Sequence, residues 1–213
     1  MENPKKKLII FDIGRVLIGF DFAEFSDKVS LKSPRSPKEV ERGIFESNDL
    51  EELHRGRISI EEFFKRFCHK LEITDFDVEE FKNLFLSIFF ENQGIEEVLI
   101  KLNPSLKRMI ISDISRFHWE EIISKNPILE QYFPQKEQRV LSFQEGVVKP
   151  EREIFQEALN RAGAEFKEAV FIDDKPSNVE GFRRLGGAGI HYDCTLHSMK
   201  ELSKSLKEFS LLT

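Results

Sequence analysis

Hydrophobic and polar positions follow each other in blocks along the chain, and the first block sets the pattern. Four apolar residues, Leu8 to Phe11, lead directly to Asp12. An uninterrupted apolar run predicts a strand buried on both faces, and residues 14–21 after it predict an extended turn. Asp12 then stands at the carboxyl end of a parallel strand, where open α/β sheets bind ligands. A carboxylate there is costly to desolvate, so we expect a cation or hydrogen-bond donors around it.

Residues 22–92 show a helical pattern instead. Ser36-Pro-Lys-Glu39 and Ser59-Ile-Glu-Glu62 are helix-start signals, which predict one helix over 38–53 and another from residue 59. A further helix is predicted over about 77–90. We interpret six phenylalanines of this segment as its apolar core: Phe63, Phe64, Phe67, Phe81, Phe85 and Phe89. No strand is expected here, so the segment is predicted to be a helical cap inserted after the first strand.

Strands and helices alternate after Gly94. The predicted strands are 107–112, 138–142, 168–173 and 189–192, and the predicted helices are 95–102, about 117–125, one opened by Pro150, one containing Asn178 to Leu185, and 197–209. Such alternation predicts an α/β fold, a doubly wound parallel sheet with right-handed crossovers. The expected organisation is a core domain of residues 1–21 and 93–213 with a helical cap subdomain of residues 22–92.

Composition narrows the classes of partner. The chain has 213 residues, of which 40% are hydrophobic and 33% charged, typical of a soluble globular protein. A net charge of −6 disfavours binding to nucleic acid or an anionic membrane. The N-terminal apolar run is too short for a signal peptide or a membrane span, and Cys68 and Cys194 show no CxxC spacing. We therefore expect a reduced, cytoplasmic protein, and the oligomeric state stays open.

Polar residues follow three of the predicted strands. They are Asp12, Ser112-Asp113 and Asp173-Asp174, and the loop 146–150 adds Lys149. In a doubly wound sheet these strand ends converge on one crevice. Carboxylate ligands without histidine or cysteine favour Mg²⁺. Asp12 suits the role of ligand and nucleophile, while Ser112 and Lys149 suit contacts with phosphate oxygens.

Four ordered motifs carry a resemblance to a known family. They are Phe11-Asp12-Ile13-Gly14 with Val16-Leu17, Ile111-Ser112, Lys149-Pro150-Glu151, and Phe171 to Asn178 with Glu180-Gly181. The chain resembles the haloacid dehalogenase superfamily of phosphohydrolases. More closely, it resembles the sugar-phosphate phosphatases typified by alpha-D-glucose-1-phosphatase and the phosphatase domain of soluble epoxide hydrolase. Those proteins have a helical cap after the first strand, and the phrase Arg55-Gly-Arg-Ile-Ser59 with Glu62-Phe63 is also similar to that group.

The resemblance implies a phosphoric monoester hydrolase. Its expected substrate is a small phosphorylated metabolite such as a sugar phosphate, hydrolysed with Mg²⁺ through an aspartyl-phosphate on Asp12. The implied catalytic residues are Asp12, Ser112 and Lys149, and the implied metal ligands are Asp12, the carbonyl of Gly14, Asp174 and Asp173. The implied phosphate-binding residues are Ser112, Asp113, Lys149 and Arg15.

Three positions depart from the family pattern. Gly14 stands where most family phosphatases have an aspartate that acts as general acid and base, although the sugar-phosphate group tolerates glycine there. Such help is worth roughly 10²–10⁴-fold, so we expect a slow enzyme or one that favours good leaving groups. Arg15 occupies a turn position that is usually small, where it either reaches the phosphate or crowds the loop. Asp113 replaces the usual asparagine; we expect it to pair with Arg15 or Lys149, with protonation or a role as base as the alternatives.

Two other functions remain open from the sequence. The three departures suit a catalytically silent binding or regulatory protein that keeps the fold. A 2-haloacid dehalogenase also lacks the second aspartate, but its chemistry has no use for the metal that Asp173-Asp174 suggests. His118 is interpreted as a structural or cap-facing residue, and His54 in the cap likewise, with substrate contact as its alternative.

Overall fold

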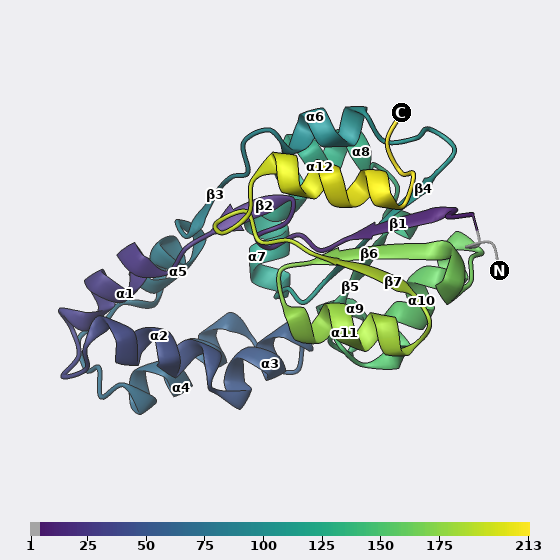
Figure 1. The fold of residues 1–213 in the computed structure, drawn as a ribbon. Helices are drawn as coiled ribbons and strands as arrows, with labels where there is room; N and C mark the ends of the chain where they lie inside the picture. The colour runs from purple at the N-terminus through teal and green to yellow at the C-terminus, as the bar shows by residue number, and fades with distance from the viewer. Residues whose placement is uncertain (1–4) are drawn as a thin grey trace.

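The computed structural model describes residues 5–213, and a five-stranded parallel sheet forms its centre (Figure 1). Its strands are β1 (Leu8–Phe11), β4 (Lys107–Ser112), β5 (Arg139–Leu141), β6 (Ala169–Asp173) and β7 (Ala188–His191), in the order β5-β4-β1-β6-β7. All neighbouring strands are parallel. The predicted doubly wound α/β fold is confirmed, and β1 is its central strand.

Helices cover both faces of this sheet, as Figure 1 shows. They are α6 (Ile95–Ile100), α7 (Arg116–Glu121), α8 (Pro127–Tyr132), α9 (Ser142–Glu145), α10 (Arg152–Ala162), α11 (Pro176–Arg184) and α12 (Met199–Glu208). Short 3₁₀ turns lie at Ile123–Lys125, Lys136–Gln138 and Phe166–Glu168. The predicted helix near 117–125 is thus α7 followed by a 3₁₀ turn, and the helix after Pro150 begins at Arg152. None of the helices in the described part of the chain has the length and apolar character needed to cross a bilayer.

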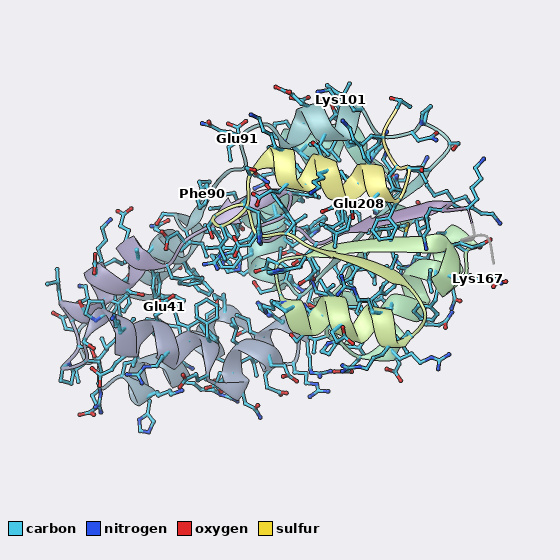
Figure 2. All side chains as sticks on the ribbon, in the orientation of Figure 1. Glu41, Phe90, Glu91, Lys101, Lys167 and Glu208 are labelled. Atoms are coloured by element: carbon cyan, nitrogen blue, oxygen red, sulfur yellow. The ribbon has the colours of Figure 1, made fainter. Side chains whose placement is uncertain are left out.

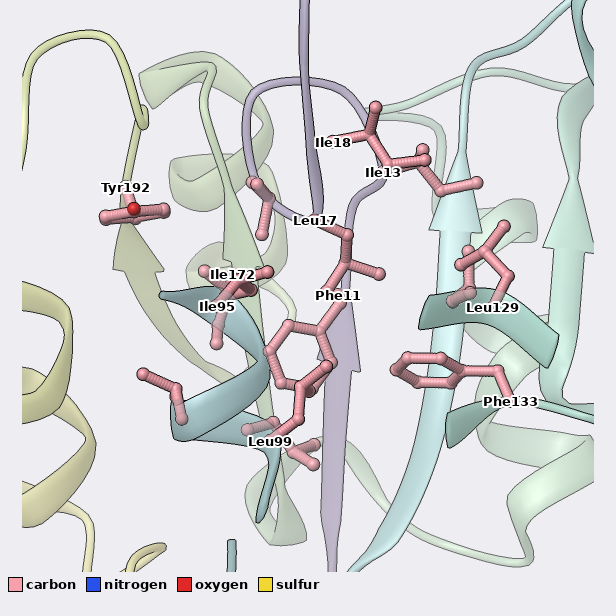
Figure 3. Close-up of a cluster of buried hydrophobic side chains, with 14 of the residues drawn as sticks. Phe11, Ile13, Leu17, Ile18, Ile95, Leu99, Leu129, Phe133, Ile172 and Tyr192 are labelled. Carbon is pink, nitrogen blue, oxygen red and sulfur yellow. The ribbon is translucent and has the colours of Figure 1, made fainter. Parts of the chain in front are cut away.

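Alternation along β1 divides the apolar core into two layers. Ile9 and Phe11 point into a cluster formed with α6, α8 and α12, whereas Leu8 and Ile10 pack against α10 and α11. Figure 3 shows Phe11 at the centre of the first layer, where its ring meets that of Phe133 edge to face at 5.9 Å between centroids. Burial on both faces holds β1 rigidly, because each large apolar side chain removed from water contributes about 1.5–3 kcal/mol.

Five further helices form a group beside the sheet (Figure 1). They are α1 (Ala23–Ser30), α2 (Pro37–Phe45), α3 (Asn48–His54), α4 (Ile60–Lys70) and α5 (Val78–Leu86). The single helix predicted over 38–53 is wrong, because the chain breaks between α2 and α3. Ser47 adopts an extended conformation there, and its hydroxyl donates to the carbonyl of Ile44 at 3.1 Å, which ends one helix and precedes the next.

Phenylalanines fill the centre of this helical group. Phe63, Phe67, Phe81 and Phe85 are all buried, as the sequence predicted, and join Phe25 in one apolar cluster. The Phe81 ring centroid lies 5.1 Å from that of Phe85 and 5.5 Å from that of Phe67. Two of the six predicted core residues, Phe64 and Phe89, are only partly buried. The group therefore has an apolar core separate from the layers around the sheet.

A two-stranded ribbon connects the helical group to the sheet. β2 (Ile18–Phe20) pairs antiparallel with β3 (Phe89–Glu91), and Figure 2 shows Phe90 and Glu91 at this connection. The expectation that residues 22–92 contain no strand is therefore wrong, and the predicted turn over 14–21 contains β2. The chain leaves and returns at neighbouring points, so the two segments can pair. Gly19 permits the pairing, because a Cβ there would lie 2.2 Å from the Phe90 ring.

We predict that Phe81→Ala lowers the free energy of unfolding by about 3–5 kcal/mol, because it leaves a cavity at the centre of the aromatic cluster. Chemical denaturation monitored by circular dichroism would measure this. The control is Phe90→Ala, whose ring is 43% exposed and should cost less than about 1 kcal/mol. Equal losses in the two variants would contradict a packed core in the helical group.

Candidate active site

Three neighbouring strands deliver polar residues to one edge of the sheet. Asp12 follows β1, Ser112 ends β4 and Asp173 ends β6. The register aligns these ends, because Phe11 is paired with Ile110 of β4 and with Ile172 of β6. The structure therefore confirms the prediction that the ends of these strands converge.

The ammonium group of Lys149 lies between two of these carboxylates. Its Nζ is 2.9 Å from Oδ1 of Asp12 and 2.7 Å from Oδ2 of Asp173, and the side chain is 2% exposed. Burial lowers the pKa of Lys149, but the charges of Asp12, Asp173 and Asp113 outweigh it and raise the pKa overall. Lys149 is consequently a charged group held inside the protein by its carboxylate partners.

Asp12 uses one carboxylate oxygen for these contacts. Oδ1 accepts the backbone N–H of Ile13 at 2.7 Å and the ammonium of Lys149, so Oδ2 takes no part in these contacts, and Asp12 also lines a cavity. The pKa of Asp12 is raised to about 8: burial is the largest cause, Lys149 opposes it, and the neighbouring charges of Asp173 and Asp174 add to it. The positive charge of Lys149 is thus insufficient to offset the effect of burial on the pKa of Asp12.

The two consecutive acids after β6 have different surroundings. Asp173 is fully engaged, since its Oδ1 accepts the backbone N–H of Lys175 at 2.8 Å and the amide of Asn178 at 3.0 Å, and its Oδ2 accepts Lys149. Asp174 is half-buried and lines the cavity with its carboxylate. Burial and then the charge of Asp173 raise the pKa of Asp174 to about 6. Asp174 is therefore the acid with oxygens available to a ligand.

These groups fit a divalent cation. One carboxylate oxygen each from Asp12, Asp173 and Asp174 lie within 4.8 Å of one another. A bound cation would favour the ionised form of all three carboxylates, and with the one ammonium of Lys149 they would then leave two negative charges, which matches one divalent ion. The turn hydrogen bonds run from Arg15 N–H to Ile18 and from Ile18 N–H to Ile13, so they leave the carbonyl of Gly14 unused. An all-oxygen set of this kind suits Mg²⁺.

The end of β4 adds the two residues expected at a phosphate. Ser112 is 3% exposed and lines the cavity together with Asp113. The side chains expected to pair with Asp113 are paired elsewhere: Arg15 with Asp193, and the ammonium of Lys149 with Asp12 and Asp173. Oδ1 of Asp113 instead accepts the backbone N–H of Lys149 at 3.0 Å. Burial raises the pKa of Asp113, while the charge of Lys149 opposes this. Asp113 thereby fixes the loop that carries Lys149.

Arg15 lies away from this cluster. Its Nη1 is 3.4 Å from Oδ2 of Asp193, and its guanidinium carbon lies 4.6 Å from the centroid of the Phe20 ring. Within the described part of the chain, the residues that line the cavity do not include Arg15. Its φ of 55° is a conformation that few side chains adopt without strain. The structure brings together every other predicted site residue, but it does not place Arg15 beside Ser112 and Lys149.

Phe20 occupies the space next to Gly14. A Cβ added to Gly14 would lie 2.8 Å from Cε1 of Phe20, closer than two carbon atoms normally approach. The guanidinium of Arg15, which lies over this ring, helps to keep it there. An aspartate at position 14 would consequently require Phe20 to move.

The cavity over Asp12 also contains residues that sequence reasoning missed. Its polar part comes from the strand ends, and the helical group and ribbon contribute Phe20, Phe22, Phe45, Leu50 and Phe85. Apolar residues in a helical segment are usually core, so their spacing gave no signal of a cavity. His54 and His118 line it too; burial lowers the pKa of His54 to about 3 and that of His118 to about 4. His118 has a structural contact, with Nε2 2.9 Å from the carbonyl of Phe85.

The turn between α3 and α4 contacts the loop of Lys149. Arg55 pairs with Glu151 and donates to the carbonyl of Gly146 at 3.1 Å. The hydroxyl of Ser142 donates to the carbonyl of His54 at 2.7 Å. The Arg-Gly phrase noted in the sequence therefore forms a second contact between the helical group and the sheet.

Comparisons with known proteins identify the family of this chain. Residues 6–186 match the haloacid dehalogenase-like hydrolase family. The chain is 29% identical to D-ribitol-5-phosphate phosphatase of Bacteroides thetaiotaomicron, over 84% of this chain and 88% of that protein. It is 26% identical to the chloroplast flavin mononucleotide hydrolase 1 of Arabidopsis thaliana, over 71% of this chain and 60% of that protein.

A solved structure shares the fold. It is a haloacid dehalogenase family enzyme from Bacteroides thetaiotaomicron in complex with magnesium and inorganic phosphate. The TM-score is 0.74 with 22% sequence identity, and the match covers 92% of this chain and 98% of that chain.

We predict that Asp12→Asn stabilises the metal-free protein increasingly as the pH rises from about 5 to 7. The pKa of Asp12 is raised from its ordinary value of 3.8 to about 8 in the folded state, so in this window the unfolded carboxyl is ionised while the folded one keeps its proton. Stability of the wild type therefore falls with rising pH, and the asparagine variant loses that component. The gap should grow by on the order of 1–3 kcal/mol across the window.

Urea denaturation in EDTA at several pH values would measure this gap. Asp27→Asn, at an exposed position of α1, is the matched control and should show no such trend. A gap that stays constant or shrinks as the pH rises would mean that Asp12 is ionised throughout this window in the folded protein.

Proposed function

Because the chain belongs to the haloacid dehalogenase-like hydrolase family, we propose that it is a Mg²⁺-dependent phosphatase of small phosphorylated metabolites. One observation carries the proposal: Asp12 lines one cavity together with Ser112, Lys149 and Asp174. A nucleophile, a hydroxyl donor, a fixed positive charge and a metal-ligating acid are the groups that phosphoryl transfer requires.

Asp12, Asp174 and the carbonyl of Gly14 would hold the metal, with Asp173 beside them. Asp173 is already bonded to Lys149, Lys175 and Asn178, so we assign it mainly to positioning. When bound, Mg²⁺ would neutralise the negative charge of the phosphate and lower its repulsion from the carboxylates. The two negative charges that the three carboxylates and Lys149 would leave in the site support the assignment of a divalent metal ion.

The side chains of the site divide the chemistry between them. Asp12 attacks phosphorus, the phosphorus–oxygen ester bond breaks, and its electron pair leaves with the alcohol oxygen, which takes a proton from water. Water then attacks the aspartyl-phosphate and releases inorganic phosphate and free Asp12. Lys149 orients Asp12 through its 2.9 Å contact and favours the ionised carboxylate. Ser112 donates its hydroxyl to a phosphate oxygen.

We further propose that residues 22–92 form a cap subdomain over a core of residues 1–21 and 93–213. The separate phenylalanine cluster and the narrow ribbon connection support this division. The turn at Arg55 keeps the cap next to the Lys149 loop. Such a cap excludes water from the charged cluster, which strengthens every electrostatic contact within it.

The relatives' names support a phosphate ester as substrate, and one of them acts on a sugar-alcohol phosphate. Free thiols at Cys68 and Cys194 support our proposal that the enzyme works in the reducing cytoplasm. The three-carboxylate cluster weighs against the alternative of a 2-haloacid dehalogenase. The contacts of Arg15 with Asp193 and of Asp113 with a backbone amide weigh against a silent protein, because neither crowds the phosphate position.

The proposal predicts Mg²⁺-dependent release of phosphate from p-nitrophenyl phosphate. Asp12→Asn should lower kcat by at least about 10³-fold, since the nucleophile is lost, and EDTA should abolish the wild-type activity. A phosphate-release assay measures both. Wild-type turnover no higher than that of Asp12→Asn would refute the proposed function.

We predict that Gly14→Asp alone does not restore an acid and base, and that it lowers kcat by about tenfold or more because the side chain collides with Phe20. With alkyl phosphates, whose leaving groups need a proton, the double variant Gly14→Asp, Phe20→Ala should have a kcat at least about tenfold higher than that of Gly14→Asp. Phe20→Ala alone is the control. A rise in kcat for Gly14→Asp by itself would show that Phe20 does not obstruct position 14.

A further inference from the structure

The side chains that the helical group and the ribbon contribute to the cavity are mostly aromatic. Rings of Phe20, Phe22 and Phe45 follow one another edge to face, with centroids 6.0 Å apart for the first pair and 5.0 Å for the second. Phe85 and Phe89 continue this surface around His118, at 4.4 and 5.2 Å. All five phenylalanines line the same cavity as Asp12, and we call them the aromatic wall.

The aromatic wall is not simply the closed core of the helical group. Phe45 lies at the end of α2 and is 44% exposed, and Leu50 beside it in the cavity is partly exposed. Phe20 is also only partly buried. Apolar side chains that line a cavity next to a charged cluster indicate a place for a ligand group of matching character.

Polar groups on this side of the cavity are few. Among residues 5–213, the polar side chains that line the cavity besides Lys175 and the strand-end cluster are the imidazoles of His54 and His118, and Nε2 of His118 already contacts the carbonyl of Phe85. A polyol phosphate would bring several hydroxyls to this surface. Each one buried without a partner weakens binding by roughly tenfold or more. The wall therefore disfavours a sugar-like leaving group.

The absence of an acid at position 14 is an independent argument against a sugar-like leaving group. Gly14 supplies no proton to a leaving oxygen, and Phe20 fills the space that a carboxyl there would need. Esters of phenols depend less on such a proton than esters of alcohols do, because the phenolate that departs is stabilised by its ring. The Phe20 ring, which occupies the space that an acid at position 14 would need, is itself part of the aromatic wall.

We propose that the substrate is a phosphate monoester of a phenol, held with its ring against Phe20, Phe22 and Phe45 and its phosphate at Asp12. The inference rests on the proposed phosphatase function and names its substrate class. The bond from phosphorus to the aryl oxygen breaks as Asp12 bonds to phosphorus, and the electron pair departs on the phenolate. The water that later hydrolyses the aspartyl-phosphate supplies the proton that neutralises it.

The first experiment compares kcat/KM for three esters with Mg²⁺. Phenyl and 2-naphthyl phosphate have leaving groups of similar acidity, so a gain for the larger ring reports contact with the wall; we expect on the order of tenfold. Ribitol 5-phosphate should be slower than phenyl phosphate by at least about 10²-fold. Equal or faster hydrolysis of ribitol 5-phosphate would overturn the substrate class while leaving the phosphatase function intact.

The second experiment removes leaving-group chemistry. Naphthylmethylphosphonate cannot be hydrolysed, and it should inhibit acetyl phosphate hydrolysis at least about tenfold more tightly than methylphosphonate does. Phe45→Ser should reduce this preference severalfold. The control Phe90→Ser removes a ring that is 43% exposed and outside the cavity lining, and it should leave the preference unchanged.

The outcomes distinguish the proposed substrate class, a phosphate monoester of a phenol, from the proposed phosphatase function. Hydrolysis of acetyl phosphate without a preference for the aromatic phosphonate would overturn the inference and keep the proposed function. A preference that Phe45→Ser and Phe90→Ser reduce equally would also overturn it. No turnover of any ester above that of Asp12→Asn would overturn both.

Discussion

Between the ends of β1 and β6, one buried ammonium group joins two carboxylates that would otherwise repel each other. Lys149 contacts Asp12 and Asp173 through its side chain, while its backbone N–H is held by Asp113 after β4. Three strands are thus linked through one residue of a loop. Breaking a buried pair of this kind typically costs several kcal/mol, because the remaining charge is left without a partner. The position of each charged group in the site depends on this arrangement.

The sheet makes that arrangement rigid. Residues of β1 are packed on both faces, so Asp12 extends from a strand that cannot easily shift. Fixed dipoles and charges contribute most to catalysis when they need no rearrangement as the reaction proceeds. The helical group is joined to this frame by the β2–β3 ribbon and by Arg55, and it brings the apolar side of the cavity over the charged one.

The sequence predicted the frame and most of the charged cluster. Apolar runs that end in Asp12, Ser112 and Asp173 indicate parallel strands whose ends meet, and the structure contains that meeting. The direction of individual side chains is harder to predict from the sequence. Arg15 lies only three residues after Asp12, yet a positive φ turns it toward Asp193.

The same limit applies to apolar residues. A phenylalanine at helical spacing has the same pattern whether it faces other phenylalanines, as Phe81 does, or a cavity, as Phe45 does. The break between α2 and α3 and the pairing of β3 depend on contacts between distant segments, which local patterns do not contain. Gly14 was recognised as unusual from the sequence, but its physical reason, the ring of Phe20, lies six residues along the chain.

The contact between Gly14 and Phe20 also constrains how this site can change over generations. A lineage that acquired an acid at position 14 in one mutational step would meet the ring at position 20 and lose function before gaining any. A smaller residue at position 20 would clear the way, but that step would also remove the partner of Arg15 and part of the aromatic surface of the cavity. A change in reaction chemistry at position 14 is therefore tied to a change in ligand preference.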